Sequence, residues 1–324
     1  MLKNIPKELI ERINTIYSKE ELEIIEKWFN CEKRKTSFRI NTLKTTDKEI
    51  LEILKNKNLE IQKIDFLKNW YFLLNWNEKD LWDLDVFKQW KIYMQSISSQ
   101  IPVDFLDIKD FNKILDITAS PWWKTSQASA ILKNTWEIVA VDNNQIRIDK
   151  LNFTIKRQSC RNVNIIKWDA RLFLQKNKNF IDYFDHIIAD LPCSAEWKIN
   201  INKEKSFSFW NTWVIKKNYN IQKDILKSIL PALKNNWTLI YSTCTLAPEE
   251  NEAVVHMLLS NFPELQIVDL NLDYKYSKKW ISSFWKNVYR KDINKSIRIL
   301  PSEESEWFFI AKFKKIKKNL IQWI

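Results

Sequence analysis

The spacing of apolar residues changes along the chain, and the change divides it into two regions. Residues 1–30 carry apolar side chains at helical spacing, which predicts helices. The alternating segment Ser37–Leu43 predicts a strand, and Thr46 with Glu49 forms a capping-box pattern that predicts the start of a helix. We therefore expect a small α/β domain over residues 1–88.

From residue 89 onward, short apolar segments alternate with polar or helix-prone sequence. This alternation is typical of a doubly wound, mostly parallel sheet. Two later segments, LQIVDL and WFFIAKFKK, predict further strands, the second of them antiparallel. We expect an α/β domain over residues 89–318 and a short tail over residues 319–324. The five segments that predict the parallel strands are KILDITAS, EIVAVDNN, NVNIIKWDA, DHIIADLPC and WTLIYSTC.

Composition and charge narrow the classes of partner. The chain has 324 residues, of which 45% are hydrophobic, and none of its apolar runs approaches the roughly 18 residues of a membrane span. We expect a soluble, cytoplasmic globular protein. The net charge of +12 makes polyanions the first partners to consider, although composition alone does not separate RNA from DNA or an acidic membrane. Cys31, Cys160, Cys193 and Cys244 lack CxxC spacing, so we expect neither a zinc site nor a disulfide framework.

The chain contains no glycine, although average usage of about 7% predicts roughly 23. It contains 17 tryptophans, and Trp122 and Trp123 follow Pro121 in a strand-to-helix turn that favours glycine. We hypothesise that UGA codons meaning glycine were translated as tryptophan, since the richness in Lys, Asn and Ile fits an AT-rich genome. The alternative is an aromatic surface that stacks on bases. Mass spectrometry of the native protein that finds tryptophan at 122 and 123 would exclude the hypothesis.

Polar residues follow the first three strands of the predicted parallel sheet, where ligands bind in folds of this class. The turn Asp116–Thr125 leads into a helix, and glycine at 122 and 123 would let its backbone pass close to a cofactor. Asp142 ends the second strand, where a carboxylate can bind both ribose hydroxyls, and Asp169 follows the third, where it can receive an adenine amino group. Each alone is more often a cap or turn residue. Together, and without a Gly-Lys-Ser/Thr run for a triphosphate, they favour an adenosyl cofactor.

Two cysteines follow the fourth and fifth predicted strands, in Asp190-Leu-Pro-Cys193 and Ser242-Thr-Cys244. A lone buried cysteine usually acts as a small hydrophobic residue. A pair at neighbouring strand ends beside a cofactor site points to chemistry instead. Methylation of cytosine at carbon 5 requires a thiolate, because that carbon is a poor nucleophile until a group adds at carbon 6.

Several separated motifs, in order, resemble those of one known family. The segments ILDITASPWWKTSQ, ADLPCSAEWK and LIYSTCTLAPEENEAVV are similar to motifs of the RsmB/RsmF and NSUN family of RNA 5-methylcytosine methyltransferases. With interruptions, the resemblance spans residues 36–315. It implies a Rossmann-like methyltransferase domain that uses S-adenosylmethionine over residues 89–318. It also implies a smaller N-terminal α/β (RRM-like) domain that binds RNA over residues 1–88.

The resemblance also bears on the tryptophans. It implies glycine at seven motif positions and leaves Trp210 or Trp213 as a true tryptophan. The chain also departs from the family at Thr118, where a cysteine is common, and at Ser302, where relatives tend to carry histidine. The seven positions are Trp90, Trp122, Trp123, Trp168, Trp197, Trp237 and Trp307.

The resemblance implies a role for each candidate catalytic residue. Cys244 attacks carbon 6, and Asp190 stabilises the activated ring through nitrogen 3 or the exocyclic amine. Cys193 assists loss of the carbon 5 proton and release of the enzyme, and Lys124 helps to place cofactor and base. The residues implied around S-adenosylmethionine are Thr118, Ala119, Ser120, Pro121, Trp122, Trp123, Lys124, Asp142, Asp169 and Asp190. We interpret His186 and His256 as structural.

On the substrate side, RKTSFRINTLK resembles an RNA-binding element. Arg34, Arg39 and Lys44 are therefore candidate phosphate contacts, with a solvated basic edge as the alternative. The target cytosine must leave its stack to reach the thiol. We expect ribosomal RNA first and transfer RNA second, a monomer, and neither a metal nor a membrane as partner.

Two other functions stay open from the sequence. An amino-group methyltransferase of the same fold favours an Asn/Asp-Pro-Pro-aromatic turn, whereas Asp190-Leu-Pro-Cys193 carries a thiol in that place. A catalytically silent RNA-binding or ribosome assembly factor would need neither cysteine.

Overall fold

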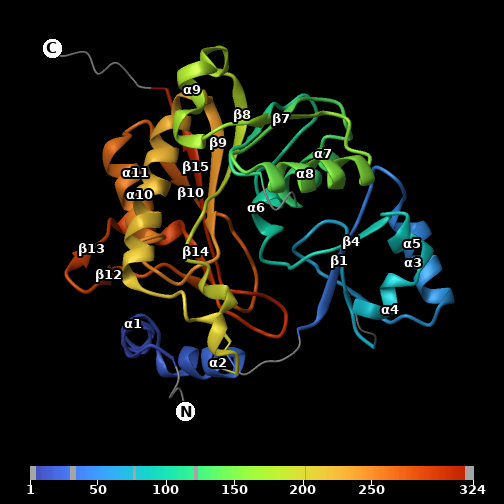
Figure 1. Cartoon of the computed structure of the whole chain (residues 1–324), viewed down its shortest axis with the longest axis horizontal. Helices are drawn as coiled ribbons and strands as arrows, with labels where there is room; N and C mark the ends of the chain where they lie inside the picture. Colours follow the sequence, from blue (N-terminus) through green and yellow to red (C-terminus); the bar gives the residue numbers. More distant parts are fainter. Residues whose placement is uncertain (1–4, 30–33, 76–77, 120–122, 201, 318–324) are drawn as a thin grey trace.

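The structure is a computed structural model with two sheets of unequal size (Figure 1). It describes residues 5–29, 34–75, 78–119, 123–200 and 202–317. Cys31, Ser120, Pro121, Trp122 and the tail over residues 319–324 lie outside the described residues.

The smaller sheet is antiparallel and has the strand order β2-β3-β1-β4. Helix α3 covers it, because Ile50 and Leu54 on one face of the helix are buried against Phe38 of β1. The Thr46 side chain accepts from the backbone N–H of Glu49, which confirms the predicted helix start. β4 belongs to this sheet, so the sheet continues beyond residue 88. The elements are β1 (Thr36–Ile40), α3 (Asp47–Asn56), β2 (Ile61–Lys63), β3 (Trp70–Leu73), α4 (Glu78–Trp82), α5 (Asp85–Lys88) and β4 (Ile92–Met94).

Two N-terminal helices, α1 (Lys7–Ile16) and α2 (Lys19–Phe29), precede the small sheet in sequence but pack elsewhere. They lie below the large sheet in Figure 1. Their apolar faces, including Leu9 and Phe29, are buried with Trp210, Leu246 and Trp307. An amphipathic helix needs an apolar partner, and the large unit supplies it.

The larger sheet has the strand order β11-β14-β15-β9-β8-β5-β6-β7, with β10 paired to β15. β5, β6, β7, β8 and β9 are parallel, and the strands beyond β9 are antiparallel. The prediction of an antiparallel last strand is confirmed. The strands are β5 (Ile114–Asp116), β6 (Ile138–Asp142), β7 (Val163–Lys167), β8 (Phe184–Asp190), β9 (Leu233–Thr243), β10 (Leu265–Val268), β11 (Ser277–Lys279), β14 (Ile297–Ile299) and β15 (Phe308–Lys315); β12 (Ser283–Phe284) and β13 (Asn287–Val288) form a separate hairpin.

Helices cover both faces of the parallel strands, which explains why those strands are apolar throughout. One face packs against α10 (Thr212–Ile229) and α11 (Glu252–Asn261), and the other against α6 (Ile101–Asp104), α7 (Trp123–Ile131) and α8 (Gln145–Arg157). The chain reverses direction across the sheet between β5 and β8, so the loops that follow these strands diverge. A binding cleft is expected there. No helix among the described residues is long and apolar enough to cross a membrane.

Candidate active site

The segments that follow β8 and β9 bring two thiols into contact. The parallel register pairs Asp190 with Ser242, so both segments leave the sheet at the same edge. The Sγ atoms of Cys193 and Cys244 lie 3.2 Å apart, within hydrogen-bond distance, and both side chains are half-buried. The structure therefore joins two cysteines that are far apart in the sequence.

The surroundings of Cys193 disfavour its thiolate form. The hydrogen bond with Cys244, and then burial, raise the pKa of Cys193 well above its ordinary value. Cys193 therefore keeps its proton and can donate it in a hydrogen bond to the sulfur of Cys244. This arrangement leaves Cys244 as the candidate nucleophile.

Asp190 lies beside the thiols and is held by two donors. Lys124 Nζ donates to Asp190 Oδ2 and Ser242 Oγ donates to Asp190 Oδ1, each at 2.7 Å. Thr118 Oγ1 donates to the backbone carbonyl of Asp190 at 2.8 Å. Lys124 is 6% exposed, so the surrounding protein packs against its side chain and limits the positions of its ammonium group. A charged pair thus lies at the end of β8, on the same segment as Cys193.

Three more carboxylates lie at the ends of the neighbouring strands. Asp116 is 1% exposed and accepts from Thr125 Oγ1 at 2.6 Å, and burial raises its pKa to about 7. Asp142 is 4% exposed and accepts from the backbone N–H of Asn144. The carboxylate oxygens of Asp169 accept from Arg171. Asp116 and Asp142 therefore end neighbouring strands as buried acceptors, which suits a ligand rich in hydroxyl groups.

Residues 103–314 of the chain match the 16S rRNA methyltransferase RsmB/F family. The chain belongs to this family. Over 97% of both sequences it is 32% identical to the tRNA (cytosine(49)-C(5))-methyltransferase of Pyrococcus abyssi. It is 28% identical to ribosomal RNA small subunit methyltransferase F of Vibrio atlanticus, over 96% of this chain and 64% of that protein.

Solved structures give the same fold. A methyltransferase homolog protein from Pyrococcus horikoshii superimposes with a TM-score of 0.82 at 25% identity, over 97% of each chain. NSun6 from Pyrococcus horikoshii with SFG has a TM-score of 0.79 at 21% identity, over 98% of this chain and 100% of that chain. The predictions of the family, of an α/β methyltransferase fold and of an enzyme are confirmed.

The large unit packs against the small sheet, and Arg39, one of the predicted phosphate contacts, is buried in the interface between them. Arg39 is 3% exposed; its Nη2 donates to Gln158 Oε1 at 2.9 Å and to Ser126 Oγ at 3.2 Å. The prediction of an RNA phosphate contact at Arg39 is wrong, because its guanidinium joins the two units instead. Arg34 forms an ion pair with Glu306.

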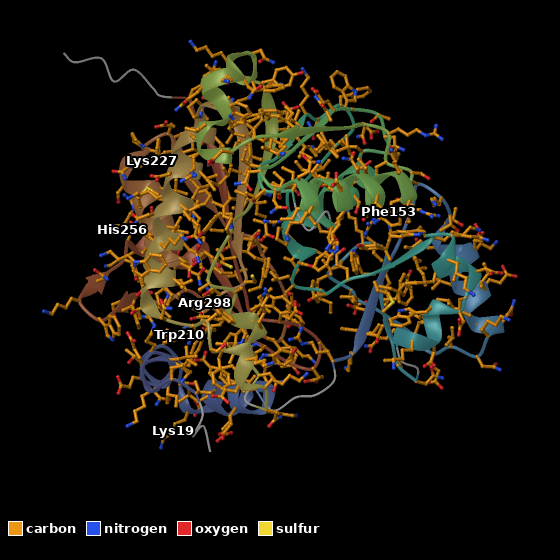
Figure 2. All side chains as sticks on the ribbon, in the orientation of Figure 1. Lys19, Phe153, Trp210, Lys227, His256 and Arg298 are labelled. Atoms are coloured by element: carbon orange, nitrogen blue, oxygen red, sulfur yellow. The ribbon has the colours of Figure 1, made fainter. Side chains whose placement is uncertain are left out.

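Lys44, the third predicted contact, lines a surface hollow of about 490 Å³. Lys44 Nζ donates to the carbonyl of Gln89, and burial followed by the charge of Arg157 lowers the pKa of Lys44. Arg157 ends α8, the helix that also carries the exposed Phe153 in Figure 2. Sequence reasoning missed Arg157, because only the fold brings this helix end to Lys44. The residues that line the hollow are Lys44, Lys88, Gln89, Trp90, Lys91 and Arg157.

The contacts of both histidines fit a structural role. His186 is 2% exposed, contacts Thr238 Oγ1 and Asn112 Oδ1, and has a pKa lowered to about 4 by burial. His256 Nδ1 accepts from the backbone N–H of Arg290. Among the described residues, no three His, Cys, Asp or Glu side chains are grouped to hold a metal ion.

The tryptophans fall into different environments. Trp90 has φ 60°, in the left-handed region that favours glycine. Trp307 is 1% exposed, and its indole Nε1 has no hydrogen-bond partner in the described structure. Trp210 Nε1, in contrast, donates to Glu196 Oε1 at 2.6 Å, while Trp213 is 66% exposed. Trp210 is therefore the better candidate for a true tryptophan.

Sequence reasoning also missed two buried carboxylates, Glu196 and Glu250, which are 1% and 0% exposed. Each follows one of the cysteines along the chain. The only signal in the sequence is their place within the motifs that carry Cys193 and Cys244, since glutamate is seldom fully buried without a partner.

Proposed function

We propose that this chain transfers a methyl group from S-adenosylmethionine to carbon 5 of a cytosine in RNA, with Cys244 as the attacking nucleophile. The observation that carries the proposal is the contact between Cys193 and Cys244 beside the Asp190–Lys124 pair. The names of the relatives support the reaction, since they include cytosine-C5 and ribosomal RNA methyltransferases.

The carboxylates at the strand ends fit the cofactor. Asp142 is the residue we propose for the ribose hydroxyls, and Asp169 for the adenine amino group. Thr118, Ala119, Trp123 at the start of α7, Lys124 and Asp190 complete the described part of the site, and the turn through Ser120, Pro121 and Trp122 belongs to it by resemblance. The cofactor supplies an electrophilic methyl group.

The chain's own residues activate the base and release it. The Cys244 thiolate forms a bond to carbon 6, and the ring electrons displaced toward carbon 5 make that carbon nucleophilic. Asp190 accepts a hydrogen bond from the exocyclic amine or from nitrogen 3, which takes up a proton from the Lys124–Asp190 pair as the thiolate adds and returns it when the bond to carbon 6 breaks. After methylation the carbon 5 proton leaves, the bond between Cys244 and carbon 6 breaks, and the thiolate is restored.

The electrostatics of Cys193 suit a role in this second half. Its pKa is raised first by the hydrogen bond with Cys244. That cause disappears while the sulfur of Cys244 is bonded to carbon 6. Cys193 then ionises more easily, at the stage when a base must assist loss of the carbon 5 proton.

On the substrate side, we propose that the hollow beside Lys44 binds RNA phosphates and that the small sheet belongs to the RNA-binding part of the chain. Four of the six residues that line the hollow are basic, and phosphate contacts hold RNA without fixing its sequence. Ribosomal RNA and transfer RNA are both substrates to test, because the Vibrio relative is named for the first and the Pyrococcus relative for the second.

The test combines labelled S-adenosylmethionine, RNA and two substitutions. Both the chain as printed and a form with Trp122→Gly and Trp123→Gly are assayed. We expect 5-methylcytosine from the unsubstituted catalytic site, a loss on the order of 10³-fold in Cys244→Ala, and a stalled covalent RNA adduct in Cys193→Ala.

Cys160→Ala is the matched control, since Cys160 is buried in a separate cluster with Leu151 and Ile155. Normal methylation by Cys244→Ala would contradict the proposed mechanism. RNA binding without methylation by any form would favour the assembly-factor alternative. Bisulfite mapping of cellular RNA then identifies the target cytosine.

A further inference from the structure

Two buried glutamates connect the segments that carry the two cysteines, and they do so reciprocally. Glu196 lies on the segment after Cys193 and contacts the segment after Cys244. Glu250 lies after Cys244 and contacts the segment after Cys193. The two contacts cross-link the segments close to both thiols.

Glu196 uses both of its carboxylate oxygens as acceptors. Oε2 accepts from Thr245 Oγ1 at 2.7 Å and from the backbone N–H of Leu246 at 2.6 Å. Oε1 accepts from Trp210 Nε1 at 2.6 Å. Three donors thus surround this carboxylate, and an amide in its place would direct an N–H group at one of them.

Glu250 has different partners. Its carboxyl accepts from the backbone N–H of Ser194, at 3.0 Å for Oε2, and from Gln222 Nε2, also at 3.0 Å. Gln222 Nε2 donates to the carbonyl of Pro192 as well, while Gln222 Oε1 has no partner in the described structure. Burial, followed by the proximity of Cys193, raises the pKa of Glu250 to about 9, so this carboxyl is protonated at neutral pH.

Several observations separate these glutamates from ordinary fold stabilisers. Buried carboxylates are costly, and apolar residues of similar size would hold a core as well. The segment between β8 and Ala195 has no helix or strand, and Ala195 has φ 54°, so hydrogen bonds from neighbouring segments hold Cys193 in place: the backbone N–H of Leu191 donates to the carbonyl of Ser242, and side chains supply the other contacts. Both glutamates contact residues directly next to the cysteines, at Ser194 and Thr245.

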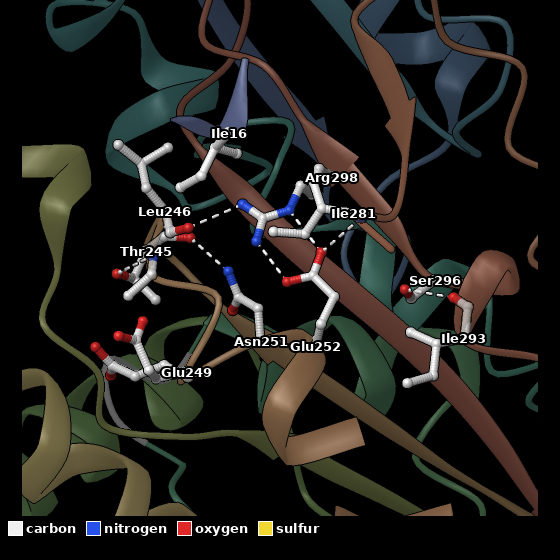
Figure 3. Close-up of polar contacts among 12 residues, drawn as sticks. Ile16, Thr245, Leu246, Glu249, Asn251, Glu252, Ile281, Ile293, Ser296 and Arg298 are labelled. Atoms are coloured by element: carbon white, nitrogen blue, oxygen red, sulfur yellow. Dashed lines mark hydrogen bonds and ion pairs between the residues drawn. The ribbon is translucent and has the colours of Figure 1, made fainter. Parts of the chain in front are cut away.

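The segment after Cys244 has additional support. Asn251 Nδ2 donates to the carbonyl of Thr245 at 3.0 Å, and Arg298 Nη1 donates to the carbonyl of Leu246 at 2.9 Å, with Arg298 paired to Glu252 (Figure 3). On the segment of Cys193, Glu250 accepts from the backbone N–H of Ser194 and also from Gln222, the residue that donates to the carbonyl of Pro192, so two of the contacts of this segment depend on Glu250. Loss of Glu250 should therefore displace Cys193 more than loss of Glu196 displaces Cys244.

We propose that Glu196 and Glu250 are positioning residues that hold Cys193 against Cys244, with Glu250 setting the position of Cys193. The catalytic consequence rests on the proposed function, whereas the thiol contact itself does not. Displacement of Cys193 leaves the attack by Cys244 possible and slows the later step in which the adduct is resolved.

The contact is measured by thiol–disulfide exchange in glutathione buffers, independently of any methylation. Two protein thiols react with one molecule of oxidised glutathione to give the Cys193–Cys244 disulfide and two molecules of reduced glutathione. The equilibrium reports the effective concentration of one thiol beside the other. The Cys160→Ala background removes a competing thiol, and mass spectrometry of peptides identifies the disulfide.

The substitutions have distinct expected results. Glu250→Ala lowers the effective concentration by about tenfold or more, because a shift of about 1 Å at a site can cost on the order of 100-fold. Glu250→Gln stays within about threefold of the parent, since a neutral amide can accept from Ser194 and donate to the free Oε1 of Gln222. Glu196→Gln lowers the effective concentration by an amount between those of the two Glu250 variants. All the hydrogen-bond partners of the Glu196 carboxylate are donors, so the N–H group of the new amide cannot replace the lost acceptor. Glu137→Ala, which removes an acceptor of Tyr183 before β6, is the matched control and leaves the equilibrium unchanged.

The activity assay then separates the steps. Glu250→Ala accumulates the covalent RNA adduct at a rate close to that of the parent and resolves it at least about tenfold more slowly. Thr245→Val, which removes the hydroxyl that donates to Glu196 and that lies 2.6 Å from Ser194 Oγ, is the milder variant if Glu250→Ala does not fold, and it lowers the effective concentration in the same direction.

Two outcomes would overturn the proposal. One is an unchanged disulfide equilibrium in folded Glu250→Ala or Thr245→Val. The other is a Glu250→Gln variant as impaired as Glu250→Ala. If the effective concentration falls as expected but the parent makes no 5-methylcytosine, the positioning role stands and the proposed function fails.

Discussion

The cysteine corner, which comprises Lys124, Asp190, Cys193, Glu196, Cys244 and Glu250, differs from the basic hollow around Lys44 in how its side chains are held. In the corner, each carboxylate has at least two donors and little freedom to move. In the hollow, Lys88 and Lys91 pair with Asp83 and Glu49, whereas neither Lys44 nor Arg157 forms an ion pair with a carboxylate anywhere in the described ranges.

The difference follows from what each region has to do. Bond formation at a fixed carbon atom tolerates little displacement, so its groups need buried hydrogen bonds that preorganise them. The RNA backbone is bound by charge over a broad surface, and cations that have no carboxylate partner can contact its phosphates. Variants in the corner should therefore change the chemical step, and variants in the hollow should change affinity for RNA.

The largest effect that sharpens this comparison is expected from Asp190→Asn. The amide keeps the shape of the side chain but loses the charge that pairs with Lys124 and that would stabilise the activated ring. We expect single-turnover methylation to slow by about 10² to 10³-fold, with the Kd for RNA within about twofold of the parent.

The matched control for Asp190→Asn is Asp185→Asn on the same strand. Asp185 pairs with Lys234 at 2.8 Å and lies near the start of β8, at the opposite end of the strand from Asp190. A methylation rate within about threefold of the parent is expected for folded Asp185→Asn. Equal losses in the two variants would show that charge on β8 acts through stability, and would contradict a role for Asp190 in the chemical step.

The sequence predicted the large sheet well because its evidence is local. Apolar runs such as DHIIADLPC become β8 at Phe184–Asp190, and burial on both faces leaves few other possibilities. The packing of α1 and α2 onto the large unit was not predictable from the sequence, because an apolar helix face does not name its partner. The place of β4 in the small sheet was not predictable either, because its pairing with β1 is set by the fold.

The site divides in the same way. Cys193, Cys244 and Asp190 lie at or just after strand ends, so the parallel register brings them together once the sheet forms. Arg39 was misread because alternation gives the face of a strand but not the element that covers it. Arg39 faces α7 and the end of α8 rather than solvent.

An intermediate effect is expected from charge reversal in the hollow. Lys44→Glu with Arg157→Glu should raise the Kd for a single-stranded RNA oligonucleotide by about tenfold at moderate salt. The slope of log K against log salt should fall by roughly one for each RNA phosphate that the protein no longer neutralises. Fluorescence anisotropy across a salt series measures both, and kcat at saturating RNA should stay within about twofold.

The control for charge reversal lies on α10. Lys216→Glu with Lys227→Glu makes the same change in net charge at exposed positions, and Figure 2 shows Lys227 on the side of the molecule away from Phe153. RNA affinity equal to that of the hollow variant would mean that net charge alone attracts RNA. The hollow would then not be a phosphate site.

The smallest effect concerns Trp90 in the wall of the hollow and Trp210 in contact with the corner. Trp90 has φ 60°, where a side chain with a Cβ atom costs about 1 kcal/mol relative to glycine. Both Trp90→Gly and Trp90→Ala remove the ring that contacts Tyr93 and Phe153, so the difference between them isolates the backbone. We expect Trp90→Gly to be the more stable of the two by about 1 kcal/mol in denaturant unfolding.

Trp210 is absent from the described residues with positive φ, so the order of stability should reverse there, with Trp210→Ala more stable than Trp210→Gly. The same order at both positions would remove the backbone support for glycine at residue 90, whereas opposite orders would strengthen the hypothesis that tryptophan stands for glycine in the hollow and for itself beside Glu196.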